Sequence, residues 1–355
     1  MQSLRDLPPL LLRADADVRR GTGHVMRCLA LAQVWQTHGG TVVFISRCDS
    51  PALRERIVAG GADLVLLAPD DSIEMDIENT LVQLAQRKDA VLVLDGYHFG
   101  FEQQEILRVA GHPLLVIDDT AHLERYRADI LLNQNLGASA LEYRCDPETT
   151  RLLGPAYAML RPEFVRWRRR FRSVRGVARK ILVTLGGSDP SNFTVRAIDA
   201  LAQLSTPGLE VRVVVGPANP RLAELKARAD KFAPRIQILS PVADMAELMA
   251  WADLAVSASG TTSWELACLG LPALTVVMAD NQRRIAAELD AMGIVQNLGW
   301  HEDVSVEHLA AAVDVFQYAS FRRLRMSERG RTLVDGRGAE RVAEALFERS
   351  CRRAA

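Results

Sequence analysis

Short apolar runs of four to six residues alternate with longer helical patterns along almost the whole chain. Most of these runs are apolar throughout rather than at every second position, which is typical of parallel strands buried on both faces. The repeated β-α order predicts doubly wound α/β domains. We expect strands at Leu10–Arg13, Thr41–Ser46, Asp63–Leu67, Ala90–Leu94, Leu114–Ile117, Asp129–Leu132, Lys180–Leu185, Glu210–Val215, Arg235–Leu239, Asp253–Val256, Ala273–Val276 and Ile294–Asn297.

The runs fall into two series, and 355 residues suit two domains better than one. We expect an N-terminal Rossmann-like domain over 1–160 and a C-terminal Rossmann-like domain over 180–325. Between them lies an arginine-rich segment, 161–179, which is read as a solvated linker helix in preference to an RNA- or membrane-binding patch, because the basic run is isolated. The last segment, 326–355, is expected to pack back on a domain surface through Val342, Ala345 and Leu346.

Composition excludes several classes of protein. Lys and Arg total 43 against 44 Asp and Glu, so no overall basic charge attracts nucleic acid. No apolar run approaches the roughly 20 residues that span a bilayer, and the N-terminus lacks the apolar segment of a signal peptide. Five scattered cysteines without a CxxC pair argue against a disulfide framework or a structural zinc site. We expect a cytoplasmic monomer with no membrane partner.

The first strand leads into a loop that ends Gly21-Thr-Gly23, and His24 then opens an amphipathic helix. Glycines let backbone N–H groups approach a phosphate, and the helix dipole favours negative charge there. An imidazole in the first helical turn is unusual for such a loop, and it is the usual proton-transfer group near neutral pH. A tight turn capped by a histidine is the simpler alternative.

Three of the charged residues around this loop are candidates for the site. Arg13 and Asp15 end the first strand, where side chains of a parallel sheet project toward a ligand. Asp15 is expected to orient an imidazole or bind a sugar hydroxyl. Arg27, one turn beyond His24, is expected either to face a phosphate or to be solvated.

A second loop of this kind follows the first strand of the second series. The strand runs into Gly186, Gly187 and Ser188, and Asp189-Pro190 precedes a helix. The glycines permit close backbone approach, and Pro190 suits a helical N-terminus. Taken alone, the loop is equally well an ordinary strand-to-helix turn.

A third group of residues lies after the run 254–256. Small and hydroxyl residues lead into a helix whose first turn carries Glu265, and they provide hydroxyl and N–H donors for a phosphate. Glu265 can accept two hydrogen bonds from a ribose diol, or can simply complement the helix dipole. Asn281 and Gln282 follow the next strand, which favours a ligand site. The cradle residues are Ser259, Gly260, Thr261, Thr262 and Ser263.

Open α/β sheets bind ligands at the carboxyl ends of their strands. Two domains of this kind leave a cleft facing both sets of strand ends. We therefore expect one site that combines loops from both halves of the chain.

Three motifs also carry a resemblance to a known family: RADAD before GTGHVMRCLALA, the TLGGSD loop, and SGTTSWELACLGLPALTVVMADNQ. They resemble the UDP-2,4-diacetamido-2,4,6-trideoxy-β-L-altropyranose hydrolases, the nucleotide-sugar hydrolases of pseudaminic acid biosynthesis. That family is similar in fold to the MurG-like glycosyltransferases of the GT-B class. The resemblance covers nearly the whole chain, and GHVMRCLALA is its most discriminating part.

The resemblance implies roles for individual residues. His24 resembles the catalytic base that acts on water, and Glu265 the carboxylate that holds the ribose of UDP. The helix start 259–263 resembles the diphosphate cradle. The residues that resemble contacts to the sugar or phosphate are Asn281, Gln282, Tyr97 and Arg161.

The implied reaction is hydrolysis of a UDP-linked sugar at its anomeric carbon, with UDP as product. One base and no protein nucleophile predict inversion and cleavage of the carbon–oxygen bond. No cofactor or metal is expected, because Asp118-Asp119 adjoins a strand end without an evident partner. A GT-B glycosyltransferase with a UDP-sugar donor, and a non-catalytic nucleotide-sugar-binding protein, remain as alternatives.

Overall fold

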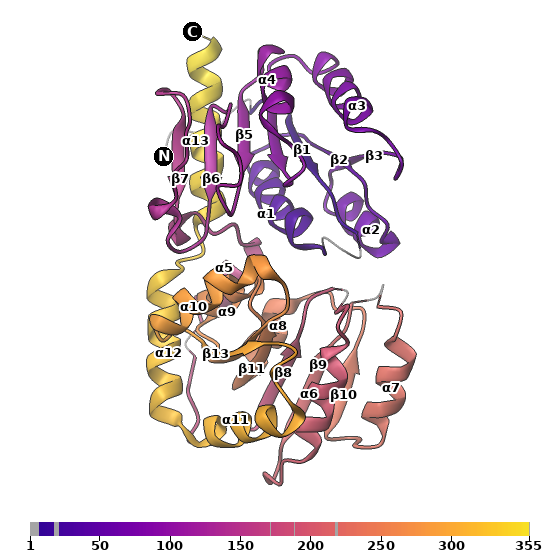
Figure 1. Ribbon diagram of the computed structural model, residues 1–355, viewed down its shortest axis with the longest axis vertical. Helices are drawn as coiled ribbons and strands as arrows, with labels where there is room; N and C mark the ends of the chain where they lie inside the picture. The colour runs from indigo at the N-terminus through magenta and orange to yellow at the C-terminus, as the bar shows by residue number, and fades with distance from the viewer. Residues whose placement is uncertain (1–6, 18–20, 171, 188, 217–218, 355) are drawn as a thin grey trace. The chain divides into compact units, whose positions relative to one another are not determined.

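The chain forms two compact units in the computed structural model (Figure 1). The first consists of Met1–Pro162 together with Arg337–Ala355, and the second of Glu163–Gly336. The structure describes residues 7–17, 21–170, 172–187, 189–216 and 219–354. Both units are doubly wound α/β domains, so the predicted fold class is confirmed.

The described part of the first unit contains a parallel sheet of seven strands in the order β3-β2-β1-β4-β5-β6-β7. The inner strand β1 pairs with β2 on one side and with the central strand β4 on the other, both in parallel. The strands are β1 (Leu10–Ala14), β2 (Val42–Ser46), β3 (Asp63–Leu66), β4 (Val91–Asp95), β5 (Leu114–Ile117), β6 (Ile130–Asn133) and β7 (Thr150–Leu153).

Alternate residues of these strands enter two separate apolar cores, one on each face of the sheet. Leu10 and Leu12 share a core with α1, α2 and α13, whereas Leu11 lies in the core formed with α3 and α4. Burial on both faces explains why the runs are apolar throughout. The helices are α1 (Gly23–Thr37), α2 (Pro51–Ala59), α3 (Ile73–Ala85), α4 (Phe101–Val109) and α13 (Gly338–Ala354), with the 3₁₀ turns η1 (Ala138–Ala140) and η2 (Pro155–Tyr157).

The second unit repeats this plan with six parallel strands among its described residues, in the order β10-β9-β8-β11-β12-β13. One face of the sheet shares a core with α6, α7 and α11, and α8, α9 and α10 contact β8, β11 and β12 respectively. The strands are β8 (Lys180–Thr184), β9 (Glu210–Val214), β10 (Ile236–Leu239), β11 (Leu254–Ala258), β12 (Ala273–Val277) and β13 (Gln296–Trp300). The helices are α5 (Pro162–Arg168), α6 (Phe193–Ala202), α7 (Leu222–Asp230), α8 (Met245–Trp251), α9 (Thr262–Leu269), η3 (Asp280–Gln282), α10 (Arg283–Ala291), α11 (Val306–Tyr318) and α12 (Ser320–Leu333).

All twelve expected strands are present, with ends shifted by at most a few residues. The strand that the sequence pattern missed is β7, whose sequence TRLL lacks a continuous apolar run. It pairs with β6 alone in the described sheet, so it forms an edge and keeps exposed residues. An edge strand needs less apolar sequence than a central one, and this explains the omission.

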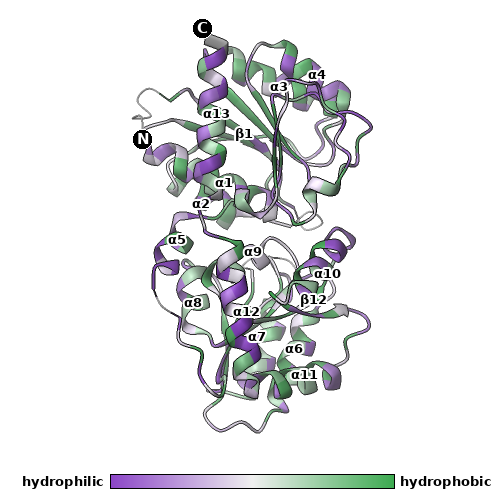
Figure 2. Ribbon diagram, turned by 90° about the vertical axis from the view of Figure 1, so that its left-hand side faces the viewer, coloured by the Kyte–Doolittle hydropathy of each residue, from purple (hydrophilic) through white to green (hydrophobic). Residues whose placement is uncertain are grey.

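The expected C-terminal segment 326–355 is divided between the units, because α12 belongs to the second and α13 to the first. Val342 and Leu346 of α13 are buried in the core beside α1, and its hydrophobic and hydrophilic residues alternate along the helix (Figure 2). Gly338 begins α13 where a Cβ would lie 2.2 Å from the Ala158 carbonyl oxygen, so only glycine allows this close approach.

The arginine-rich segment is solvated only in part: Arg166, Arg169, Arg170 and Arg175 are exposed, whereas other arginines of the segment bind within a unit. Arg161 is buried within the first unit, and α5 starts the second. Arg168 donates to the carbonyls of Cys268 (3.0 Å) and Arg331 (2.7 Å), and Arg172 donates to those of Leu269 (2.9 Å) and Ala252 (2.6 Å). These carbonyls lie at or near the ends of α8, α9 and α12, so the arginines complete hydrogen bonds that the helices leave open.

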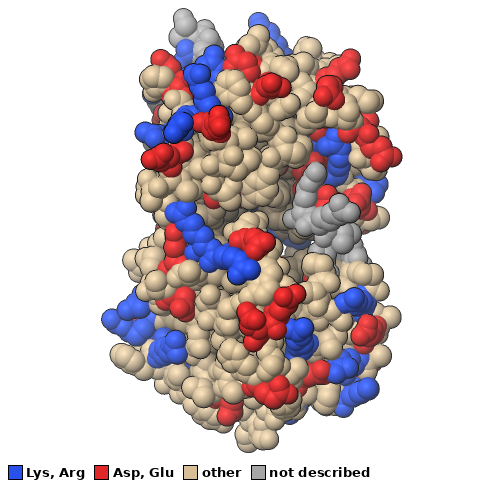
Figure 3. Space-filling model, viewed as in Figure 1, with Lys and Arg blue, Asp and Glu red and all other residues tan. Residues whose placement is uncertain are grey.

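The surface is consistent with the balanced charge of the sequence. Acidic and basic side chains are interspersed over the face shown in Figure 3. Within the residues that the structure describes, no helix combines the length and the apolar character needed to cross a membrane.

Candidate active site

Each sheet has one point at which the order of its strands reverses, between β1 and β4 in the first unit and between β8 and β11 in the second. Crevices at the carboxyl ends of such strands are the usual ligand sites of doubly wound folds. The loop before His24 follows β1, and the other two predicted loops follow β8 and β11. All three predicted loops therefore lie at these reversal points.

His24 in the first turn of α1 forms a pair with a carboxylate that the sequence pattern did not identify. Its Nδ1 lies 2.6 Å from Oδ1 of Asp95, the last residue of β4. Asp15, which was expected to orient an imidazole, does not contact His24; its carboxylate lies 3.6 Å from Nε2 of His98. Asp95 therefore lies at His24 in the place expected for Asp15, and a contact of Asp15 with a sugar hydroxyl stays a prediction.

Asp95 is fully buried, and several donors compensate its charge. Arg27 donates from Nε and Nη2 at 2.6 Å each, and the Cys28 thiol lies 3.6 Å away. Burial by itself raises the pKa of Asp95, but the charge of Arg27 and the contact with His24 outweigh burial and hold that pKa well below its usual range. Asp95 is therefore an ionised carboxylate.

This ionisation determines the tautomer of His24. A carboxylate only accepts hydrogen bonds, so Nδ1 of the neutral ring carries the proton and donates to Asp95. Nε2 is then the basic nitrogen. Nη2 of Arg27 also lies 3.2 Å from Nδ1, but this is a contact between two donors, because Nδ1 carries the proton of the neutral ring.

Tyr97 lies beside His24, with ring centroids 5.4 Å apart and the rings nearly perpendicular. Its hydroxyl donates to Asp119 (3.0 Å), which also accepts from Nδ2 of Asn135 (2.9 Å). Asp119 thus has several partners, although the sequence showed none for the Asp118-Asp119 pair. The structure brings the predicted residues His24 and Tyr97 together.

A second histidine–carboxylate pair lies on the other side of Tyr97. Nδ1 of His122 is 2.5 Å from Asp118, and Nε2 is 3.1 Å from the Tyr97 carbonyl oxygen. The ring centroids of His122 and Tyr97 are 5.6 Å apart. Asp118 also accepts from the hydroxyl of Tyr126. The main chain and the ring of Tyr97 are therefore both held in place.

Arg13, which was expected to project toward a ligand, lies below the surface. Its guanidinium is fully buried and bridges Asp15 and Asp76, with Nε 2.7 Å from Asp76. Arg47 also donates to Asp76 (2.7 Å). These contacts with two buried carboxylates give Arg13 a structural role, and its contact with a ligand stays a prediction.

The remaining predicted residues of the first unit lie close to α1. Gly23 is the first residue of α1, and Gly21 before it has a φ of +73°. Arg161 is buried, and its Nη1 lies 3.8 Å from the sulfur of Met26. A buried position beside α1 gives Arg161 a packing role, and direct contact with sugar or phosphate stays a prediction.

In the second unit, the loop after β8 is held by Asp189. Its carboxylate accepts from the backbone N–H groups of Phe193 (3.0 Å) and Thr194 (2.8 Å) at the start of α6. Asp189 is thus a helix cap. Gly187 approaches the loop after β9 so closely that a Cβ on Gly216 would lie 2.0 Å from its carbonyl oxygen. Ser188, also predicted here, lies outside the described residues.

The loop after β11 turns directly into α9. Ser259 and Ser263 are buried, and their hydroxyl oxygens have no hydrogen-bond partner among the described residues. Thr261 is exposed, Gly260 and Thr262 are half-buried, and α9 follows with its first-turn N–H groups. Hydroxyl and backbone donors therefore gather at one helix N-terminus, which is chemistry suited to an anion.

Glu265, Asn281 and Gln282 lie around this helix start. Glu265 is half-buried in the first turn of α9. Gln282 accepts from the Met278 N–H (2.9 Å), and its Nε2 is 3.5 Å from where a Cβ of Gly260 would be. Asn281 is exposed. Gln282 thus lies next to the cradle, as the order of the strands predicted.

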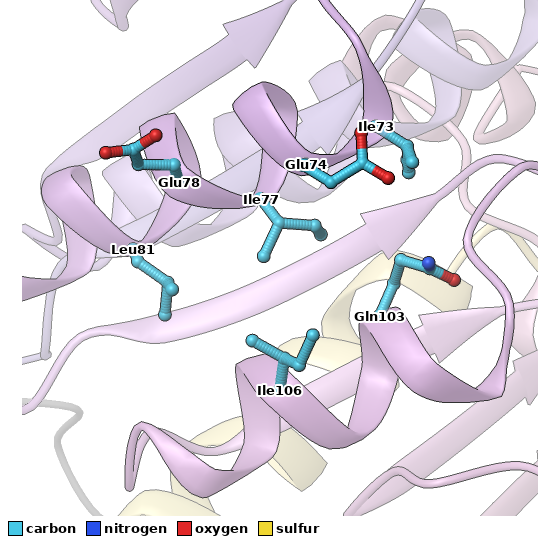
Figure 4. Close-up of a pocket in the computed structure, with 7 residues that line it drawn as sticks. All are labelled: Ile73, Glu74, Ile77, Glu78, Leu81, Gln103 and Ile106. Carbon is cyan, nitrogen blue, oxygen red and sulfur yellow. The ribbon is translucent and has the colours of Figure 1, made fainter.

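Elsewhere in the first unit, a hollow of about 220 Å³ lies between α3 and α4 (Figure 4). It contains none of the predicted site residues. Among the described residues, no cluster of three or more His, Cys, Asp or Glu side chains is arranged to hold a metal ion. The lining residues of the hollow are Ile73, Glu74, Ile77, Glu78, Leu81, Gln103 and Ile106.

The sequence contained a signal for the residues that were missed. His24, Arg27 and Cys28 stand at spacings of three and four, which place them on one face of a helix. Asp95 ends the apolar run VLVL, as Asp118 follows LLVI. An acidic residue at the end of a buried strand needs a buried partner, and the helix face beside it offers one.

Comparison with known proteins agrees with this architecture. Residues 181–332 match the sequence model of the glycosyltransferase family 28 C-terminal domain. A crystal structure of MurG from Acinetobacter baumannii has a TM-score of 0.63 at 16% identity, covering 96% of this chain and 100% of that one. UDP-GlcNAc 2-epimerase from Neisseria meningitidis, bound to UDP-GlcNAc, gives 0.63 at 12%, covering 96% and 100%. The fold is therefore that of the MurG-like GT-B proteins.

Three curated relatives are between 25% and 27% identical to this chain. The uncharacterized protein MJ1062 of Methanocaldococcus jannaschii is 26% identical over 76% of this chain, which spans 55% of that relative's length. Spore coat polysaccharide biosynthesis protein SpsG of Bacillus subtilis is 27% identical over 94% of this chain and 96% of its own. A Helicobacter pylori protein named pseudaminic acid cytidylyltransferase and UDP-2,4-diacetamido-2,4,6-trideoxy-β-L-altropyranose hydrolase is 25% identical over 57% of this chain and 37% of its own.

We expect the contribution of Asp95 to stability to depend on pH. Its pKa is lower in the folded chain than in the unfolded one, so the stabilisation is present above the usual carboxyl value and is lost as pH falls below about 4. Asp95→Asn should lower the free energy of unfolding by about 3 kcal/mol near pH 7. Urea denaturation at several pH values should show this difference shrinking in acid, whereas the exposed Asp70→Asn changes little at any pH. A difference that is constant with pH would contradict the assignment.

Proposed function

We propose that this chain hydrolyses a UDP-linked 2,4-diacetamido-2,4,6-trideoxyhexose to the free sugar and UDP, as a step of pseudaminic acid biosynthesis. The observation that carries the proposal is the pair of His24 and Asp95 at the strand reversal of the first unit. The motif resemblance and the H. pylori relative, whose name includes this hydrolase, support the choice of sugar. The match of 181–332 supports a nucleotide-sugar substrate.

In the proposed reaction, Nε2 of His24 takes a proton from water while the water oxygen bonds to the anomeric carbon. The bond from that carbon to the phosphate oxygen breaks, and UDP leaves with the electron pair. Asp95 stabilises the imidazolium that forms, because its carboxylate already accepts from Nδ1. Attack from the face opposite UDP inverts the anomeric carbon.

The second unit binds UDP in this proposal. The helix start of α9, with the hydroxyls of Ser259 and Ser263, neutralises charge that develops on the leaving diphosphate. Glu265 accepts hydrogen bonds from the ribose hydroxyls. Gln282 and Asn281 contact the sugar side, and Tyr97 is the corresponding contact from the first unit.

A glycosyltransferase that passes the sugar to an acceptor alcohol is the second candidate. The match to the glycosyltransferase family 28 C-terminal domain favours it, as does the likeness of fold to MurG. Both candidates use the same donor, so they differ in what attacks the anomeric carbon.

Proton NMR of the protein with candidate UDP-diacetamido-trideoxyhexoses distinguishes them. We expect free sugar and UDP in equal amounts without any acceptor, with the inverted anomer appearing first. In ¹⁸O-labelled water the label should enter the sugar and not the phosphate, since the carbon–oxygen bond breaks. A UDP-sugar that stays intact until an acceptor alcohol is added would favour the transferase instead.

Replacing the proposed base should abolish turnover without affecting nucleotide binding. We expect His24→Asn to lower the rate on the order of 10²- to 10⁴-fold, while UDP affinity by isothermal titration stays at the wild-type value. His38→Asn, at the other end of α1, is the matched control and should keep full activity. Normal turnover by His24→Asn would exclude the mechanism.

Replacing Glu265, the residue proposed to bind the ribose, should weaken UDP binding, which the replacement of His24 leaves unchanged. Glu265→Ala is expected to weaken UDP binding on the order of 10- to 100-fold, because two hydrogen bonds to a charged acceptor are lost. Isothermal titration with UDP and 2′-deoxy-UDP measures this, and the variant should discriminate the two ligands less than the wild type. Glu247→Gln, in the first turn of the neighbouring helix α8, is the control. Equal discrimination by both proteins would rule out the ribose contact.

A further inference from the structure

Arg27 is buried on α1 and joins two carboxylates that come from different strands. Through Nε and Nη2 it donates to both oxygens of Asp95 at the end of β4. Through Nη1 it contacts both oxygens of Asp119 after β5, at 3.0 and 2.9 Å. The two carboxylates raise the pKa of Arg27 well above its usual value against the opposing effect of burial, so the guanidinium is charged.

These two carboxylates have separate partners in the candidate active site. Asp95 orients His24, and Asp119 accepts from the hydroxyl of Tyr97. The rings of His24 and Tyr97 are in edge contact. One guanidinium therefore fixes the carboxylate behind each of the two side chains at once, a geometry that the planar fork of arginine allows and a lysine ammonium does not.

The charge of Arg27 also acts on His24 directly. Among the described residues, the charged or titratable groups in contact with His24 are Asp95 on β4, Arg27 on its own helix, and Tyr97 in the loop after β4. Asp95 favours the protonated imidazole, whereas Arg27, with Nη2 3.2 Å from Nδ1, disfavours it. The two charges therefore act on the imidazole in opposite directions.

We propose that Arg27 is a positioning residue that aligns His24 and Tyr97 through their carboxylates and offsets the charge of Asp95, which keeps His24 able to accept a proton. The role of His24 as a base rests on the proposed function. The electrostatic part of the proposal concerns His24 itself and can be measured without any substrate.

Arg27→Gln tests the charge, because glutamine keeps an N–H donor for Asp95 and removes the positive charge. The NMR titration of the His24 ring, assigned by its absence from His24→Asn, should shift upward by about one pH unit or more. The acid limb of the pH profile of kcat should move upward with it, with KM changing much less than kcat. Arg108→Gln is the matched control, since Arg108 also bridges two carboxylates, Asp129 and Asp146, and it should leave the His24 titration unchanged.

Asp119→Asn gives the opposite expectation. It removes a negative charge and leaves Arg27 paired with Asp95 alone, so the His24 titration should shift downward. Asp119 is partly exposed, so this variant also decides the question if Arg27→Gln fails to fold by circular dichroism. A His24 titration that is unchanged in Arg27→Gln, or unchanged or raised in Asp119→Asn, overturns the proposal. If the His24 titration shifts as predicted but the protein consumes no UDP-sugar, the proposed function is refuted and the electrostatic role of Arg27 is supported.

Discussion

The candidate site depends on the compensation of one buried negative charge. Asp95 ends a central strand, where a carboxylate without partners would be expelled or protonated. The donors that keep it ionised, His24, Arg27 and Cys28, all come from one face of α1. The same contacts therefore attach α1 to the sheet and set the orientation of the imidazole.

Most of the fold could be predicted from sequence because its signal is local. A strand buried on both faces must be apolar over its whole length, so runs such as Leu114–Ile117 are visible without knowledge of their neighbours. The strand β7 was missed because it lies at the edge of the sheet and keeps exposed residues, so its sequence need not be apolar throughout. The order of strands within each sheet then places the three predicted loops at the reversal points.

The site was only partly predictable, since the partner of a charged residue is chosen by tertiary structure. His24 was identified from its place in a loop–helix motif, but Asp95 lies 71 residues further along the chain. Arg13 is a second example. Its position at the end of a strand predicted a contact with a ligand, but its partner Asp76 on α3, 63 residues further along the chain, holds it below the surface. The arginine-rich segment is a third case: charge density suggested a solvated helix, whereas the carbonyl groups that Arg172 binds cannot be seen in its own sequence.

Buried charges of this kind contribute more to specificity of arrangement than to net stability. Burying an ion pair costs about as much in desolvation as its attraction returns, so an apolar replacement is often no less stable. Arg13 with Asp15 and Asp76, and Arg27 with Asp95 and Asp119, both occupy the carboxyl edge of one sheet. Apolar side chains in place of these ion pairs could pack in the core without loss of stability. They could not fix the tautomer of His24 or the direction of the Tyr97 hydroxyl. Such networks suit a strand edge that must present polar groups in one arrangement, as the proposed function requires of this edge.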